Sequence, residues 1–398
     1  MAPEKGVPQK GYVYLDYAAS APMCDAALEA ERNYERSEIR GANPNSLHTL
    51  GRRAARALDG ARRDLAQCLG GGFRPSDIVF TSGGTESNNI ALFGLAEGAR
   101  DRDRRRTKVI VSAIEHDSEM DVASGLRGRG FDVALVRPGR DGRVTPDSIA
   151  AELDETVALV SVMSANNETG VIQPIDEIAR PVHAAGALMH TDAAQAFGRV
   201  PLALDNVDAV SAAAHKIGGP VGIALLALRP RTPFRPQSFG GGQEQGRRAG
   251  TQDVRSALAF AAAAKDVCDG LAEKRALVSS RANRLYGRLC AESTGIVPTT
   301  SAVVDDGRLP GMVSIMCPGV DSETLVLKLD QAGFEVSAGS ACSSGSLDAS
   351  HVLTAMGIPR DQALGSLRIS FDTRVGEEDL DRLADTLLEI VREETGRR

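Results

Sequence analysis

The stretch Ala209-Val-Ser-Ala-Ala-Ala-His-Lys-Ile-Gly-Gly-Pro220 is a small apolar run that stops at His215-Lys216 and is followed by a glycine turn. The run predicts a buried strand that ends on a lysine. An ammonium group is costly to bury, so this lysine needs a nearby carboxylate or a covalent use that removes its charge, such as a Schiff base. Taken alone, a lysine in this position is more often a strand-end residue that reaches solvent.

A second short apolar run, Ala187-Leu-Met-His-Thr-Asp-Ala-Ala-Gln195, precedes the first and contains Asp192. One connection separates the two runs, so Asp192 and Lys216 can lie at the same edge of one sheet, where open α/β sheets place their ligands. Pyridoxal phosphate (PLP) needs a lysine for its Schiff base and a carboxylate that keeps its pyridine nitrogen protonated. The pair therefore favours a PLP site over a solvent-facing lysine.

Length and composition indicate an ordinary α/β protein. The chain has 398 residues, 42% hydrophobic and 25% charged, with 41 glycines, which allows one large domain and a smaller one. A net charge of -7 gives no electrostatic signature of nucleic-acid binding. Because no apolar stretch approaches eighteen residues and the N-terminus has no apolar signal core, we expect a cytoplasmic protein without a membrane segment.

The cysteines do not form a recognisable framework. The six are scattered without a CxxC pair, and the six histidines show no HExxH-like spacing, so we expect neither disulfides nor a metal site. Cys342 stands apart, because the segment 337–346 around it consists otherwise of serine, alanine and glycine. A cysteine in such a flexible chain is a poor core residue, and its position indicates a nucleophile.

Strands and helices are predicted to alternate over most of the chain. We expect strands at 12–16, 77–80, 108–112, 131–136, 157–163 and 222–228, and a helical, alanine-rich connector from about 253 to 293. The last hundred residues predict a compact α+β domain with strands at 312–317, 334–337 and 367–371 and helices at 322–332 and 377–394. The predicted domains are a segment 1–25 that packs with the small domain, a PLP-binding domain 26–260, and a domain 261–398 that carries the Cys342 loop.

Two turns lie where this sheet would present its ligand. Thr81-Ser-Gly-Gly-Thr-Glu-Ser87 follows a strand and precedes a helix, an arrangement that aims backbone N–H groups at a phosphate, although such a turn is weak evidence alone. It matches neither a Walker A loop nor a GxGxxG fingerprint. Glu115-His116 follows the next strand; His116 is either a satisfied polar group or a ring that stacks on a cofactor and moves protons.

Three polar segments have further possible roles, and the first two have two interpretations each. Asn43 either caps the next helix or contacts a substrate carboxylate, and the pair Asn166-Asn167 forms a turn or holds a cofactor oxygen. The loop 239–252, which contains Gly240-Gly-Gly-Gln-Glu, is too glycine-rich for regular structure and too charged for a core. A loop of this length is expected to contact something.

With these residues in place, the chain resembles the cysteine desulfurases of fold-type I, class V PLP enzymes, in the group I typified by NifS and IscS. The resemblance covers nearly the whole chain, from Tyr14-Leu-Asp-Tyr-Ala-Ala-Ser20 to the last helix. Further matching motifs are Asn43-Pro44, Ser82-Gly-Gly-Thr-Glu-Ser87, Glu115-His116, Asn166-Asn-Glu-Thr-Gly170, His190-Thr-Asp-Ala-Ala-Gln195, His215-Lys216, Arg248-Ala-Gly-Thr251, Gly339-Ser-Ala-Cys342 and Leu367-Arg-Ile-Ser370.

The resemblance implies a role for each matching residue. It implies that Lys216 binds PLP covalently, that Asp192 binds the pyridine nitrogen, that His116 stacks on the ring, and that Cys342 accepts the sulfur. It further implies that Gln195 contacts the phenolic oxygen, that Gly84, Thr85 and His215 hold the phosphate with Thr251 of a second subunit, and that Asn43, Asn167 and Arg368 hold the substrate carboxylate.

The implied activity is conversion of L-cysteine to L-alanine, with a persulfide on Cys342, in a two-domain homodimer. The acceptor would be an iron-sulfur scaffold or a thiolation relay. The family commonly has a serine at the position of Ala213, so one phosphate hydroxyl is missing here. The alternatives are a selenocysteine lyase or another class V PLP enzyme, and a scaffold without catalysis that only binds acceptor proteins.

Overall fold

The computed structural model describes residues 11–339 and 349–396 of the chain. It divides into two compact units. The first, which we call the sheet unit, comprises Ser20–Asn167 and Val171–Leu271; the second, the C-terminal unit, comprises Met1–Ala19, Glu168–Gly170 and Ala272–Arg398. The predicted domain boundaries after residues 25 and 260 stay predictions.

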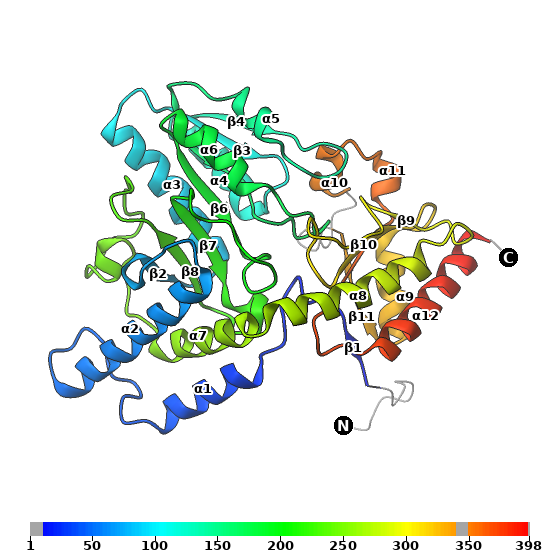
Figure 1. Ribbon diagram of the computed structural model, residues 1–398, viewed down its shortest axis with the longest axis horizontal. Coiled ribbons are helices and arrows are strands. Elements are labelled where there is room, and N and C mark those ends of the chain that lie inside the picture. The colour runs from blue at the N-terminus through cyan, green and yellow to red at the C-terminus, as the bar shows by residue number, and fades with distance from the viewer. Residues whose placement is uncertain (1–10, 340–348, 397–398) are drawn as a thin grey trace. The chain divides into compact units, whose positions relative to one another are not determined.

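The sheet unit is built on seven strands, mostly parallel, and confirms the predicted α/β class (Figure 1). Their order is β2-β8-β7-β6-β5-β3-β4; β4, β3, β5, β6 and β7 run parallel, and β8 runs antiparallel to β7 and β2. The strands are β2 (Ile78–Thr81), β3 (Lys108–Ser112), β4 (Asp132–Val136), β5 (Val157–Ser161), β6 (Leu188–Asp192), β7 (Ala209–Ala213) and β8 (Ala224–Leu228).

The central strands are apolar because helices cover the sheet. β5, β7 and β8 are buried at every position, as expected for strands covered on both faces. Helix α3 packs against β5 to β8, and its Leu92 and Leu95 are fully buried. The helices of this unit are α1 (Asp25–Arg36), α2 (Thr49–Leu69), α3 (Gly84–Arg102), α4 (Asp117–Gly128), α5 (Pro146–Ala150), α6 (Ile175–Ala184) and α7 (Val254–Cys268).

The C-terminal unit is α+β, also as predicted. An antiparallel sheet has the order β12-β13-β10-β9, and β1 pairs in parallel with β11. The strands are β1 (Val13–Tyr14), β9 (Val297–Pro298), β10 (Met312–Met316), β11 (Phe334–Glu335), β12 (Ser337–Ala338) and β13 (Ser366–Ser370). The helices are α8 (Leu271–Leu289), α9 (Ser322–Gln331), α10 (His351–Ala355), α11 (Arg360–Ala363) and α12 (Glu377–Thr395). Within the described residues, no helix has both the length and the apolar character needed to span a bilayer.

The connector predicted from 253 to 293 is helical, as expected. It consists of two helices, α7 and α8, and Gly270 between them takes a φ of 62° that favours glycine. One sequence-based expectation needs correction. The loop 239–252 is not wholly excluded from the core. Its Glu244 is buried and bonds to both terminal nitrogens of Arg62, at 2.8 and 2.7 Å.

Two glycines on α3 let an extended segment pass close to the helix. The N–H of Arg235 donates to the carbonyl of Gly94 at 2.9 Å. A Cβ at Gly98 would lie 2.5 Å from the backbone nitrogen of Phe234 and 2.6 Å from the carbonyl carbon of Pro233. These are backbone atoms, which cannot move aside as a side chain can.

We therefore expect Gly98→Ala to lower the free energy of unfolding by about 1 to 3 kcal/mol, because the helix and this segment must separate. Gly60→Ala on α2 is the matched control, since a Cβ at Gly60 meets nothing within 4 Å. Alanine there should raise stability by about 0.5 to 1 kcal/mol. Urea unfolding of both variants and the wild type measures this; equal effects would contradict the packing explanation.

Candidate active site

The residues predicted to act on a cofactor ring lie at one edge of the large sheet. β6 ends at Asp192, and β7 is followed directly by a single 3-10 turn, Ala214–Ile217, that carries His215 and Lys216. β6 and β7 are parallel, with Asp192 paired in register with Ser211. Asp192 and Lys216 therefore project from the same end of adjacent strands, as the sequence predicted.

The turn that carries Lys216 is tightly held. Its C-cap, Gly218, has a φ of 78°, and a Cβ at Gly219 would lie 2.9 Å from the Ala214 Cβ. Arg199 donates to the carbonyl of Lys216 at 3.1 Å. Burial, and then the charge of Lys216, lower the pKa of His215 to about 4. His215 is therefore neutral near pH 7.

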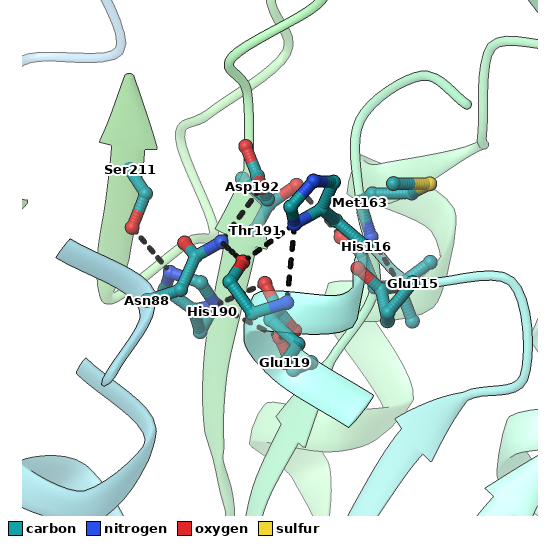
Figure 2. A network of polar contacts seen from close by, with 12 residues as sticks. Asn88, Glu115, His116, Glu119, Met163, His190, Thr191, Asp192 and Ser211 are labelled. Carbon is teal, nitrogen blue, oxygen red and sulfur yellow. Dashed lines mark hydrogen bonds and ion pairs between the residues drawn. The ribbon is translucent and has the colours of Figure 1, made fainter. Parts of the chain in front are cut away.

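Asp192 is almost fully buried and is surrounded by donors. The backbone N–H of Ala194 donates to one carboxylate oxygen at 2.8 Å, and the side-chain amide of Asn88 donates to the other at 2.7 Å (Figure 2). Both contacts suit the ionised form, which only accepts hydrogen bonds. A buried carboxylate held in this way can pair with a protonated ring nitrogen.

His116 is oriented by the first turn of α4, which it caps. Its Nδ1 accepts the backbone N–H of Ser118 at 3.1 Å, so the proton of the neutral ring lies on Nε2. The Ser118 hydroxyl lies 3.0 Å from the same Nδ1 and 3.0 Å from the Asn88 amide nitrogen. One hydrogen-bonded chain thus joins His116 to Asp192 through Ser118 and Asn88 (Figure 2).

The glycine turn after β2 forms the N-terminus of α3. Gly83 is its N-cap and gives no side-chain cap, and a Cβ at Gly83 would meet nothing within 4 Å. A Cβ at Gly84 would lie 3.6 Å from that of Ala213, so the helix begins beside the end of β7. N–H groups at an uncapped helix N-terminus, together with the helix dipole, suit a phosphate.

The loop 239–252 returns to this helix end within the same chain. Arg248 Nε lies 2.8 Å from Glu86 Oε1, in the first turn of α3. Burial alone would raise the pKa of Glu86, but hydrogen bonds from Arg248 and Ser82 lower it. Thr251, near the end of the loop, is exposed.

The remaining predicted residues are placed as follows. Asn43 accepts the backbone N–H of Asn45 at 2.9 Å, and α2 is capped by His48 instead, so the capping interpretation of Asn43 is wrong. Asn166 donates to the carbonyl of Ile114 at 3.0 Å, while Asn167 is partly exposed. In the C-terminal unit, the buried Arg368 pairs with Asp16 at 2.7 Å.

The other predicted residues are Gln195, Thr85 and Cys342. Gln195 is buried, and its side-chain oxygen accepts a hydrogen bond from Arg199 at 3.0 Å. The NH2 group of Gln195 therefore points away from Arg199. Thr85 is exposed in the first turn of α3. Cys342 lies outside the described residues. In the described part of the chain, no group of three His, Cys, Asp or Glu side chains is arranged to hold a metal ion.

Four polar residues at this edge were missed in the sequence: Asn88, Ser118, Glu119 and His190. Asn88 follows the glycine turn by one helical turn, and Glu119 lies one turn after His116. Helical spacing from a candidate residue is therefore the signal that could have found these two. His190 Nε2 lies 3.0 Å from the Ser211 hydroxyl, between β6 and β7.

Comparison with known proteins agrees with this geometry. The family model for aminotransferase class-V matches residues 13–383. The IscS-like cysteine desulfurase of Mycobacterium tuberculosis is 39% identical over 379 residues, covering 94% of this chain and 95% of the relative. A solved NifS-like protein superposes with a TM-score of 0.87 at 33% identity, covering 96% of this chain and 100% of that one. A structure described as SspA in complex with cysteine has a TM-score of 0.76 at 29% identity, covering 90% and 98%.

Buried His190 should make the folded protein sensitive to acid. Burial lowers its pKa to about 3, below the value near 6.5 expected in the unfolded chain. As pH falls below 6.5, His190 therefore binds a proton in the unfolded chain but not in the folded protein. The free energy of unfolding decreases until the pH approaches 3. Between about pH 5.5 and 4, His190→Gln should reduce the loss by about 1.4 kcal/mol per pH unit in urea unfolding.

His183 supplies a control of opposite sign. A hydrogen bond with Asp208 raises its pKa, so its contribution is present at low pH and is lost as pH rises. His183→Gln should therefore leave the acid-side loss at least as steep. An unchanged acid slope in His190→Gln would show that His190 is not the group responsible.

Proposed function

Because the chain belongs to the aminotransferase class-V family and, within it, to the cysteine desulfurases, we propose that it converts L-cysteine to L-alanine and carries the removed sulfur as a persulfide on Cys342. The observation that carries the proposal is the placement of Asp192 and Lys216 at the ends of adjacent parallel strands, beside an uncapped helix N-terminus. The relative solved with cysteine supports cysteine as the substrate.

The residues present fit PLP as the cofactor. Lys216 would hold it covalently, Asp192 would pair with the pyridine nitrogen, and the N–H groups at Gly84 and Thr85 would hold the phosphate beside neutral His215. When bound, PLP supplies an electron sink for the α carbon of the substrate. Ala213 has no hydroxyl that could bond to the phosphate. The N–H groups at the N-terminus of α3 would therefore supply more of the hydrogen bonds to it.

Protons at the site are assigned to two side chains. Lys216, as a free amine, would remove the proton from the α carbon of the substrate. His116 carries its neutral-ring proton on Nε2, because Nδ1 is occupied by the N–H of Ser118. His116 can therefore stack on the ring and give or take a proton at Nε2 without turning its ring.

Sulfur transfer would need the thiolate of Cys342, the substrate and the electron sink that PLP supplies when bound. The thiolate attacks the substrate sulfur, an S–S bond forms, and the C–S bond breaks with its electron pair on carbon. That carbon is then protonated to give alanine, so cysteine and thiol are converted to alanine and persulfide without an external oxidant. Asn43, Asn167 and Arg368 remain the predicted ligands of the substrate carboxylate.

We further propose a homodimer in which Thr251 reaches the phosphate site of the second subunit. The exposure of Thr251, on a loop already held by Arg248 and Glu244, supports this role. The sulfur acceptor is proposed to be a protein, an iron-sulfur scaffold or a thiolation relay, in the cytoplasm. A selenocysteine lyase or another class V enzyme would use the same cofactor site without Cys342.

Lys216→Ala should abolish alanine formation while leaving the protein folded, because the phosphate and ring contacts do not depend on the lysine. In the wild type, borohydride reduction followed by peptide mapping should place the cofactor on Lys216. Cofactor found on another lysine would contradict the assignment. Circular dichroism of the variant controls for folding.

Cys342→Ala should separate the two halves of the reaction. The variant should still change the cofactor absorbance on addition of L-cysteine and still exchange the α proton, because these steps use Lys216, Asp192 and His116. Persulfide and alanine should both fall at least a hundredfold, on the order of the loss of a catalytic nucleophile. Cys290→Ala is a matched control outside the proposed chemistry; near-normal alanine formation by Cys342→Ala would favour the lyase alternative.

A further inference from the structure

Three carboxyl groups are gathered beneath the sheet edge that carries the candidate site. Glu115 and Glu119 have no exposed surface, and Asp192 is 8% exposed. Figure 2 shows the three side chains in one polar network. They come from the turn between β3 and α4, the first turn of α4 and the end of β6. Three negative charges in one buried cluster would cost more free energy than hydrogen bonds return, so the cluster must hold a proton.

The contacts of Glu119 show where a proton is needed. Ser161 donates to Glu119 Oε2 at 2.7 Å, and the same hydroxyl lies 2.8 Å from His190 Nδ1. The other oxygen, Oε1, receives no hydrogen bond from the residues that the structure describes and lies 3.7 Å from His190 Nδ1. In Glu119, Oε2 therefore accepts a hydrogen bond, whereas Oε1 receives none from the described residues.

Of the two glutamates, Glu115 has the carboxylate that is better stabilised by hydrogen-bond donors. Its Oε1 accepts the Met163 backbone N–H at 2.7 Å and the Ser112 hydroxyl. Glu115 thus has two donors, whereas Glu119 has one, from Ser161. Two neighbouring buried carboxyl groups are stabilised when one of them holds a proton, and the donors already present on Glu115 leave Glu119 as the side that carries it.

His190 cannot neutralise the cluster in place of that proton. It is fully buried, and burial lowers its pKa to about 3, so it is neutral. Burial, followed by the charges of Glu115 and Asp192, raises the pKa of Glu119 well above its usual value. The titratable groups that face Glu119 are thus Glu115, His190 and Asp192, and none of them is a cation near pH 7.

We propose that Glu119 is protonated in the folded protein, donates to Glu115, and is a positioning residue that leaves Asp192 ionised at the sheet edge. The same bonds tie α4 to β5 through Ser161 and to β6 through His190. The link from Asp192 to catalysis rests on the proposed function, whereas the protonation of Glu119 does not. Glu119 would contact no substrate or cofactor and would act only through Asp192.

Infrared spectroscopy of the full-length protein without cofactor tests this directly. With glutamate labelled by 13C at the side-chain carboxyl, the wild type should show at pH 7 a protonated-carboxyl band that shifts with the label. Because burial also raises the pKa of Glu115, to about 8, Glu119→Gln should diminish that band rather than abolish it, and Asp121→Asn, an exposed change on the same helix, should keep it in full. No labelled band in the wild type, or an undiminished band in Glu119→Gln, would overturn the proposal.

Coupling to Asp192 is tested by titrating the same band in Asp192→Asn. Removing that negative charge should move the midpoint of the band to lower pH by about one unit, a shift that a purely packing role would not produce. An unmoved midpoint would overturn the positioning role. Because the wild-type titration needs no variant, a variant that fails to fold leaves the first test intact.

Rescue by a neutral donor gives a readout on the cofactor. Glutamine can donate to Glu115 as a protonated glutamate does, so Glu119→Gln should bind PLP within about threefold of the wild type, roughly 0.7 kcal/mol. Glu119→Val, which fills space but cannot donate, should bind PLP at least tenfold more weakly. Equal losses in both variants would contradict a role as neutral donor, whatever the activity of the enzyme.

Discussion

The candidate site depends on one constraint, which is that a negatively charged carboxylate must be stabilised where water does not reach it. A buried carboxylate needs donors on each oxygen, and Asp192 has them from Ala194 and Asn88. Asn88 belongs to α3, whose N-terminus faces the proposed phosphate, while Ala194 belongs to the turn after β6. The position of α3 therefore serves two purposes. The helix holds Asp192, the proposed partner of the ring nitrogen, and its dipole would point at the proposed phosphate.

The fold and the placement of Asp192 and Lys216 at one sheet edge were predictable because each is marked locally. Apolar runs that stop at Asp192 and at Lys216 indicate parallel strands, and parallel strands bring their carboxyl ends to one edge. The glycine turn before α3 is likewise visible in sequence, because a helix start after a short strand and two glycines has few alternatives. The resemblance to cysteine desulfurases assigned roles to these positions, and the fold and family it implied are confirmed.

Other features could not be predicted because they depend on pairs that are distant in sequence. Arg62 and Glu244 are 182 residues apart, and neither segment indicates that a charged residue of a glycine-rich loop is buried. The break at Gly270 was not predicted, although a glycine inside a helical stretch can mark the end of a helix. Glu119 looks like an ordinary exposed residue of a first helical turn until β5 and β6 are placed against it.

The buried pair of Arg62 and Glu244 has a consequence for assembly. Glu244 also accepts the Phe80 N–H at 3.0 Å, and both Glu244 and Gln245 adopt left-handed backbone angles, so the middle of the loop is fixed within its own chain. Immobilising a side chain on association costs about 0.5 to 1.5 kcal/mol. Much of that entropy is already lost when the single chain folds, so in the proposed homodimer a second copy would meet a preorganised surface and less of the binding energy would be consumed in ordering the loop.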